Sequence, residues 1–241
     1  MKLIAVTGAG AGLGRHIAQR ALEQGYEVAG FSRSKPGKDP GFPLTVGDVT
    51  DHAAVAAFFA SLRKKGASCQ KESGKEGLWG IVNAAGIASM NLLPATPPAT
   101  MADVLKVNLL GVMHCCAEGA KLLLRDSGRK GGRVVNFSSI AAPLALAGES
   151  VYAASKAGVE TFTRCLAREL APFNITANVV APGPIATGIL RGLSQEQIDA
   201  VVQRQVVRRM AEPEDVWNLV RFLLDERSSM ISGEIIHLGG V

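Results

Sequence analysis

The stretch Thr7-Gly8-Ala9-Gly10-Ala11-Gly12-Leu13-Gly14 follows an apolar run over 3–7 and opens a helical pattern over about 12–24. Its glycines permit a tight turn and let backbone amides approach a pyrophosphate group at the N-terminus of the following helix. Glycine-rich stretches are often plain turns. This one lies at the first crossover from a strand to a helix, where a dinucleotide site has to lie. We therefore interpret it as a cofactor-binding turn.

Short apolar runs and helical patterns alternate along the rest of the chain. We expect strands over 3–7, 26–32, 44–46, 78–83, 133–137, 175–180 and 234–238, and helices over about 12–24, 100–125, 151–170, 194–208 and 213–224. Thr50 or Asp51 caps a further helix, and the polar stretch 66–78 is expected to be an exposed loop. This alternation predicts an α/β fold, a single doubly wound parallel sheet of the Rossmann type with helices on both faces.

Composition excludes several classes of protein. With 241 residues of which 47% are hydrophobic, the chain can bury a substantial core, and no shift in composition marks a linker. We expect one dinucleotide-binding domain over 1–241, with substrate loops at about 140–150 and 184–210. No apolar run is long enough for a membrane span, and the first one is too short for a signal peptide. The formal charge of +5 suits an anionic partner or cofactor, but two Trp and two Tyr offer no stacking platform for nucleic acid.

Cysteine and histidine usage points to no metal site. The four cysteines form no C-x-x-C pair, and the four histidines share no ligand spacing, so we expect no bound metal, structural histidines and a reducing cytoplasmic location.

The turn reads T-G-x-x-x-G-x-G, which is wider than G-x-G-x-x-G and resembles the short-chain dehydrogenase/reductase family. Further matches occur in family order along essentially the whole chain: Asn83-Ala84-Ala85-Gly86, Asn108, Ser139, Tyr152-Ala153-Ala154-Ser155-Lys156 and Pro182-Gly183-Pro184-Ile185-Ala186-Thr187. The resemblance implies an oxidoreductase. It also implies a set of cofactor-binding residues: Gly8, Gly10, Ala11, Gly12, Leu13, Gly14, Ser32, Arg33, Asp48, Val49, Asn83, Ala84, Ala85, Gly86, Tyr152, Lys156, Pro182, Gly183, Ile185 and Thr187.

Tyr152 and Lys156 are four residues apart on an expected helix, so their side chains share one face. A lysine ammonium beside a phenol favours the phenolate, so we expect Lys156 to lower the pKa of Tyr152. The phenol then donates a proton when a carbonyl is reduced, or accepts one when an alcohol is oxidised. An isolated pair of this kind is more often a plain surface pair, and the surrounding motifs favour the catalytic interpretation.

Ser139 and Asn108 complete the expected catalytic set. Ser138 is the neighbouring alternative, and the family spacing selects Ser139 to hold the substrate oxygen toward Tyr152. The resemblance implies that Asn108 holds a water that links Lys156 to solvent; the alternative is an amide bonded locally to backbone.

The second expected strand ends in Gly30-Phe31-Ser32-Arg33-Ser34, without the acid that binds an adenosine ribose in NAD enzymes. A hydroxyl and a guanidinium suit a 2′-phosphate instead, so we expect NADP(H) rather than NAD(H). The alternative is a solvated basic loop. Asp48-Val49 resembles the family's adenine-contacting pair.

Apolar residues follow Ser139 at 140–146, which predicts an apolar carbonyl substrate. The stretch 208–216 resembles 3-oxoacyl-[acyl-carrier-protein] reductases of fatty acid biosynthesis. That resemblance implies reduction of a small or carrier-bound 3-oxoacyl thioester with Tyr152 as general acid, in a homotetramer. The alternatives are a dehydrogenase of a secondary alcohol or hydroxysteroid, and a non-catalytic cofactor sensor. A candidate docking patch for the carrier protein comprises Arg125, Arg129, Lys130 and Arg133, unless these residues form a solvated loop.

Overall fold

The computed structural model describes residues 1–69, 77–126, 131–186 and 194–241. Its strands are β1 Leu3–Thr7, β2 Glu27–Ser32, β3 Leu44–Val46, β4 Leu78–Asn83, β5 Gly132–Phe137, β6 Ile175–Pro182 and β7 Ile235–Leu238. Its helices are α1 Gly12–Glu23, α2 His52–Cys69, α3 Pro98–Leu105, α4 Gly111–Asp126, α5 Ala141–Leu144, α6 Ser150–Leu170, α7 Gln195–Val202 and α8 Pro213–Leu224.

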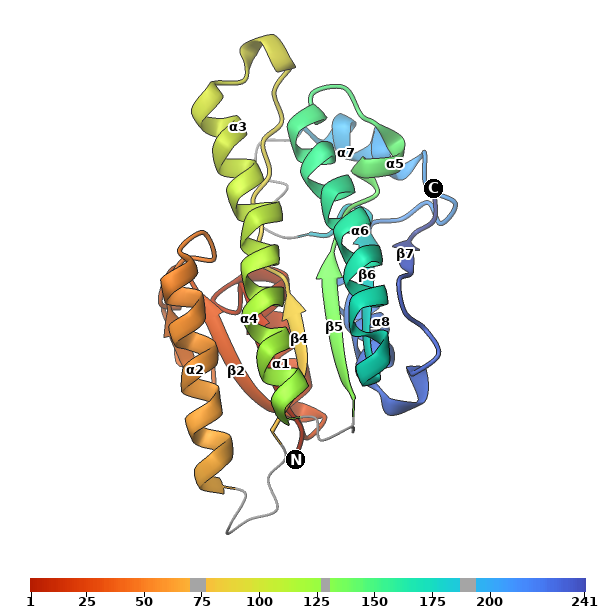
Figure 1. The fold of residues 1–241 in the computed structure, drawn as a ribbon. Helices are drawn as coiled ribbons and strands as arrows, with labels where there is room; N and C mark the ends of the chain where they lie inside the picture. Colours follow the sequence, from red (N-terminus) through yellow and green to blue (C-terminus); the bar gives the residue numbers. More distant parts are fainter. Residues whose placement is uncertain (70–76, 127–130, 187–193) are drawn as a thin grey trace.

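All seven strands form one parallel sheet in the order β3-β2-β1-β4-β5-β6-β7. In Figure 1 the helices α2, α4 and α6 cover one face of the sheet, while α1 and α8 cover the other. Every residue of β4, β5 and β6 is buried, as expected of strands covered on both faces. The predicted doubly wound parallel fold is confirmed.

The strand order reverses between β1 and β4. From β1 the chain adds β2 and β3 on one side of the sheet, and then β4 to β7 on the other side. Helices and loops diverge at such a point, and a crevice opens outside the carboxyl ends of the strands. The glycine turn after β1 and the segment after β4 both begin at this crevice. The fold therefore brings two of the sequence motifs together at one edge of the sheet.

The two faces of the sheet bury separate apolar clusters. Phe58 and Phe59 of α2 pack with residues of α4 and α6 on one face. Ile17 of α1 and Trp217 of α8 pack on the other face, where both side chains are almost fully buried. These clusters hold the helices in place while leaving the carboxyl edge of the sheet free.

The structure corrects three of the expected helices. The helix expected over 100–125 is interrupted by a π-helical segment, Lys106–Leu110, which separates α3 from α4. The helix expected over 194–208 is α7, which ends at Val202, because the buried Gln205 side chain donates to the carbonyls of Val207 and Arg209 and so stabilises a turn. Helix α2 extends to Cys69, into the stretch expected to be a loop. Asp51 caps α2 by accepting from the N–H groups of Ala53 and Ala54.

Arg133 does not belong to an exposed docking patch. Its side chain is buried, donates to the backbone carbonyls of Gly132, Asp225 and Glu226, and lies over the ring of Trp79. It also lies at the start of β5, at the edge of the sheet opposite the glycine turn. Arg129 and Lys130 lie outside the described residues. The expected patch is therefore wrong for Arg133, which lies far from the crevice.

One helical stretch, Pro98–Arg125, is long and apolar enough to cross a membrane by length and composition. Half of its most apolar window is buried inside the protein. Its apolar character is accounted for by the packing of α4 against α2 and the sheet.

The α8 face of the core provides a test of this packing. Trp217→Ala should lower the free energy of unfolding by about 3–5 kcal/mol, because it empties a site where the side chain is 1% exposed. Phe222→Ala on the same helix is the control, since Phe222 is 47% exposed and its loss should cost only about 0.5 kcal/mol. Denaturant unfolding of both variants measures the difference, and equal losses would contradict the assigned core.

Candidate active site

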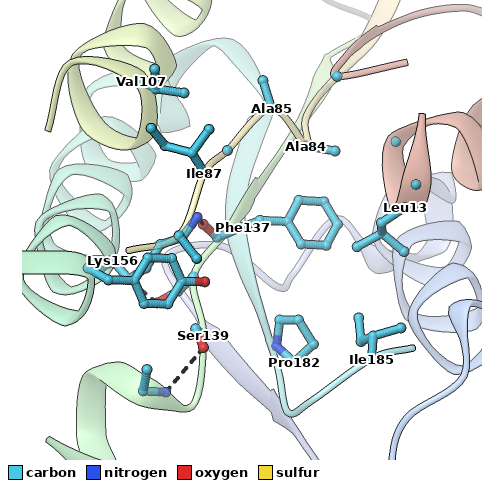
Figure 2. A pocket seen from close by; sticks show the side chains of 18 of the residues that line it. Leu13, Ala84, Ala85, Ile87, Val107, Phe137, Ser139, Lys156, Pro182 and Ile185 are labelled. Carbon is cyan, nitrogen blue, oxygen red and sulfur yellow. Dashed lines mark hydrogen bonds between the residues drawn. The ribbon is translucent and has the colours of Figure 1, made fainter. Parts of the chain in front are cut away.

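A cavity of about 710 Å³ lies at the carboxyl edge of the sheet. Figure 2 shows Ser139 and Lys156 on one side of it, Leu13 and Ile185 on the other, and Phe137 between them. The cavity joins the motifs found along the sequence, because eighteen of the expected site residues line it: Gly8, Ala11, Gly12, Leu13, Gly14, Ser32, Arg33, Asp48, Val49, Ala84, Ala85, Gly86, Ser139, Tyr152, Lys156, Pro182, Gly183 and Ile185.

Three expected residues, Gly10, Asn83 and Asn108, do not line the cavity, and a fourth, Thr187, lies outside the described residues. Asn83 points into the helix layer, where its Nδ2 donates to Asn136 Oδ1 at 2.8 Å and to Cys116 Sγ at 3.3 Å. Asn83 therefore stabilises the sheet instead of facing a cofactor. Gly10 packs against Ser32 Oγ and so lets the end of β2 approach the turn.

The glycine turn is shaped to admit a phosphate group. Gly8 has φ +69°, and a Cβ there would lie 2.9 Å from the carbonyl oxygen of Ala84. A Cβ at Gly14 would lie 2.5 Å from the carbonyl oxygen of Gly8. No side chain caps α1 at Ala11, so the first N–H groups of this helix are left for a ligand. The turn therefore fits the pyrophosphate of a dinucleotide.

The far end of the cavity carries the groups expected to select the cofactor. Ser32 is half-buried and Arg33 is exposed at the rim. Asp48 turns one oxygen toward its own loop, where Oδ1 accepts from the backbone N–H and the hydroxyl of Thr50. Arg33 is thus the charged side chain that the described rim offers to a 2′-phosphate at the end of β2.

Tyr152 and Lys156 lie on the first turns of α6 and are 7% and 5% exposed. Burial raises the pKa of Tyr152 to about 12; the Ser139 hydroxyl opposes this rise by hydrogen bonding, and the Glu149 carboxylate adds to it. The phenol is therefore protonated at neutral pH.

Burial also lowers the pKa of Lys156, to about 8. Its Nζ donates to the carbonyl of Phe137 at 3.0 Å and lies 5.7 Å from the centre of the Tyr152 ring. The ammonium thus faces the ring and a carbonyl. Burial of the phenol outweighs the hydrogen bond from Ser139, so the net shift of the Tyr152 pKa is upward and not the lowering that we expected.

Ser138 and Ser139 both line the cavity, but only the hydroxyl of Ser138 is engaged by a nearby carboxylate. Ser138 is 3% exposed, and its Oγ bonds to Glu160 Oε1 at 2.6 Å. Ser139 Oγ accepts from the N–H of Ala141 at 3.2 Å, which leaves its proton for another acceptor (Figure 2). The geometry therefore agrees with the family spacing in selecting Ser139.

Asn108 lies in the π-helical segment and is 0% exposed. Its Oδ1 accepts from the N–H of Ile87, and its Nδ2 donates to the carbonyl of Ile87 and to Ser155 Oγ. Both amide protons are in use, so the side chain holds the segment after β4 against α6. These partners lie 21 and 47 residues away along the chain, so the bonding is long-range and differs from the local backbone bonding named as the alternative. The water-holding role that the resemblance implies stays a prediction.

Two of the apolar residues expected after Ser139, Ile140 and Leu146, line the cavity. Sequence reasoning did not single out the other apolar side chains that line it: Ile87, Met90, Val107, Phe137, Ile198 and Val201. A polar exception is Glu149, which is 9% exposed. Glu149 lies three residues before Tyr152, and this helical spacing could have predicted that the two side chains lie on the same side of the helix. The described residues contain no group of three or more His, Cys, Asp or Glu side chains that could hold a metal ion.

Comparison with known proteins gives a consistent result. The family model described as enoyl-(acyl carrier protein) reductase matches residues 8–240. The 3-oxoacyl-[acyl-carrier-protein] reductase FabG of Staphylococcus aureus (strain Mu50) is 33% identical over 237 residues, covering 98% of this chain and 95% of the relative. FabG of Vibrio cholerae serotype O1 is 32% identical over 248 residues, covering 99% of this chain and 96% of the relative.

A solved structure is also similar over nearly the whole fold. The ligand-free aldohexose dehydrogenase of Thermoplasma acidophilum superposes with a TM-score of 0.83 at 27% identity, covering 99% of this chain and 93% of that one.

The buried lysine predicts a dependence of stability on pH. Lys156→Met should raise the free energy of unfolding at pH 7 by about 1–3 kcal/mol, because the folded state no longer buries an ammonium. Between pH 8 and 10.5 the unfolded wild type binds more protons than the folded one, so wild-type stability rises and the gain should shrink across this range. Denaturant unfolding of wild type and Lys156→Met at several pH values from 7 to 10.5 measures the difference in free energy of unfolding. The exposed Lys35→Met is the control, and a gain that is constant across this range would contradict the burial argument.

Proposed function

Because this chain belongs to the short-chain dehydrogenase/reductase family of oxidoreductases, we propose that it reduces a carbonyl group with NADPH, using Tyr152 as the general acid. The observation that carries the proposal is the buried Tyr152 hydroxyl beside Ser139, at the apolar end of a cavity whose other end suits a dinucleotide. Burial raises the pKa of this phenol to about 12, which makes it a weaker acid than a free tyrosine. It still holds a proton at neutral pH and is more acidic than an alcohol, so it can give that proton to a developing alkoxide.

The chain supplies the cofactor's cradle from four places. The glycine turn would hold the pyrophosphate, and Ser32 and Arg33 would bind the 2′-phosphate. The segment after β4 and the Pro182-Gly183 turn, which line the same cavity, would hold the rest of the cofactor. When bound, the cofactor supplies the hydride that a carbonyl reduction requires. These residues bind and orient it through backbone N–H groups and one guanidinium.

The proton is handled by Ser139, Tyr152 and Lys156. Ser139 Oγ donates to the carbonyl oxygen of the substrate and holds it toward the phenol, while Tyr152 Oη donates the proton that completes the alcohol. Lys156 lies 5.7 Å from the Tyr152 ring centre, and its positive charge stabilises the phenolate left after transfer. The surrounding apolar wall excludes water from the reacting carbon.

A 3-oxoacyl thioester, or a related apolar ketone, is the substrate class that we propose. The support comes from the two FabG relatives, whose names specify 3-oxoacyl groups on an acyl carrier protein, and from the apolar wall around Tyr152. An acyl carrier protein as partner, assembly as a homotetramer and a cytoplasmic location belong to the same proposal. The non-catalytic sensor is disfavoured because Ser139, Tyr152 and Lys156 are all present at the cavity.

A second candidate is oxidation of a secondary alcohol or other hydroxy compound. It is favoured by the structural similarity to an aldohexose dehydrogenase and by the carboxylate of Glu149 at the substrate end of the cavity. The two candidates use the same side chains in opposite directions.

Tyr152→Phe should reduce the rate of NADPH oxidation with an acetoacetyl thioester by at least a factor of about 10². NADPH affinity should stay within about threefold of wild type, because the ring remains in place and only the proton donor is lost. The absorbance of NADPH, followed over time, gives the rate of its oxidation. Fluorescence titration gives the dissociation constant of NADPH. Turnover at the wild-type rate would remove Tyr152 from the mechanism. Testing ketones and quinones alongside the thioester separates an acyl reductase from a general carbonyl reductase.

Arg33→Asp should weaken NADPH binding by on the order of a hundredfold and change NADH binding little, because only NADPH carries the phosphate that Asp repels. Arg63→Asp, an exposed arginine of α2 outside the cavity, is the matched charge control. Equal losses of affinity for the two cofactors would show that Arg33 does not read the 2′-phosphate.

A further inference from the structure

Glu149 is a carboxylate in a place where the cavity is otherwise apolar. It immediately precedes α6, three residues before Tyr152, and its side chain lines the cavity with Met90, Leu146 and Ile198. The residue is 9% exposed, so about nine-tenths of it is removed from water. Such a group needs a partner, because a buried carboxylate without one costs free energy.

Within the part of the chain that the structure describes, the Glu149 carboxylate has no hydrogen-bond or ion-pair partner. It does not cap α6, although it occupies the N-cap position. The nearby ammonium of Lys156 is directed at the Phe137 carbonyl instead. Burial alone raises the pKa of Glu149, in agreement with a carboxyl group that no cation compensates. Glu149 is thus an acceptor that lines the cavity and that no other described residue uses.

We propose that Glu149 is a specificity-determining residue whose carboxylate accepts a hydrogen bond from a hydroxyl group of the substrate, on a carbon adjacent to the one that is reduced. The helical spacing of Glu149 and Tyr152 places both groups on the same end of α6, over the same substrate. Tyr152 and Ser139 bind the oxygen of the carbonyl that is reduced, and Glu149 binds the hydroxyl on the adjacent carbon. The proposal rests on the carbonyl reduction described above. Within that reaction it places hydroxylated carbonyl compounds ahead of the 3-oxoacyl thioester, whose two carbonyl groups only accept hydrogen bonds.

The hydrogen-bonding chemistry of the Glu149 carboxylate and of the substrate group opposite it decides the substrate class. An ionised carboxylate only accepts hydrogen bonds, so it stabilises a hydroxyl group and disfavours a second carbonyl at the same place. A plain ketone leaves the carboxylate unpaired, which costs binding free energy. Hydroxy ketones and their diol products pair with it while their carbon chains contact the apolar wall. The preferred substrates are therefore hydroxylated carbonyl compounds, ahead of ketones that carry only acceptors.

The test compares matched ligands that differ by one hydroxyl. The protein saturated with NADPH does not react with alcohols, so the dissociation constants of 1,2-butanediol and 2-butanol are measured on it by ligand-observed NMR. Wild type should bind the diol more tightly by about tenfold, as expected for a hydrogen bond to a charged group. In Glu149→Leu the preference should vanish, and in Glu149→Gln, whose amide oxygen is an uncharged acceptor, it should be intermediate.

Two controls keep the outcomes distinct. Glu169→Leu removes an exposed glutamate of the same helix and should keep the full preference, and thermal unfolding checks that each variant is folded. Equal affinities in wild type, or a preference that survives Glu149→Leu, would overturn the assignment. Turnover of 1-hydroxy-2-butanone against 2-butanone with NADPH is measured separately. A diol preference without turnover of any carbonyl compound would reject the proposed reduction and still support the role of Glu149.

Discussion

The close contact between the glycine turn and the end of β4 is the constraint on which the rest of the site depends. Gly8 approaches the backbone of Ala84 and Ala85 so closely that a Cβ would be 2.9 Å away, and the N–H of Ala85 donates to Thr7 Oγ1. These contacts tie the carboxyl ends of β1 and β4 together at the reversal of strand order. The uncapped start of α1 is then held facing the cavity, and the segment that leads to Ile87 begins from a defined position.

The segment after β4 is in turn connected to α6, the helix that carries Tyr152 and Lys156. Asn108 bonds to both backbone groups of Ile87 and to Ser155 on α6, so the π-helical segment links the end of β4 to the turn that carries Tyr152. The bond between Ser138 and Glu160, with Lys156 donating to Phe137, ties α6 to the end of β5. The cost of burying an ammonium and a phenol is offset by this packing. Tyr152 and Lys156 therefore stay in a site from which water is largely excluded.

The cavity has two chemically different ends. The end near Arg33 is exposed and positively charged, which suits the phosphates of a dinucleotide, whereas the end near Tyr152 is enclosed by apolar side chains with Glu149 as an exception. The family relationship accounts for the first end and for Ser139, Tyr152 and Lys156. The second end is built from loops, so it differs most between related enzymes. A single carboxylate there changes which substrates are stabilised without changing the reaction that is performed on them.

The sequence by itself determined the fold class, the strand segments and the family, because apolar periodicity and glycine spacing are local signals. It also identified most of the residues that line the cavity, through motifs in a recognisable order. Only the tertiary structure decided that Asn83 and Asn108 are used internally, since hydrogen-bond partners 21 to 53 residues away cannot be read from spacing. Burial likewise decided that the pKa of Tyr152 is raised, and packing from separate loops and α7 placed Glu149 in an apolar wall without a partner among the described residues. These outcomes depend on desolvation and on long-range contacts, which exist only once the chain has folded.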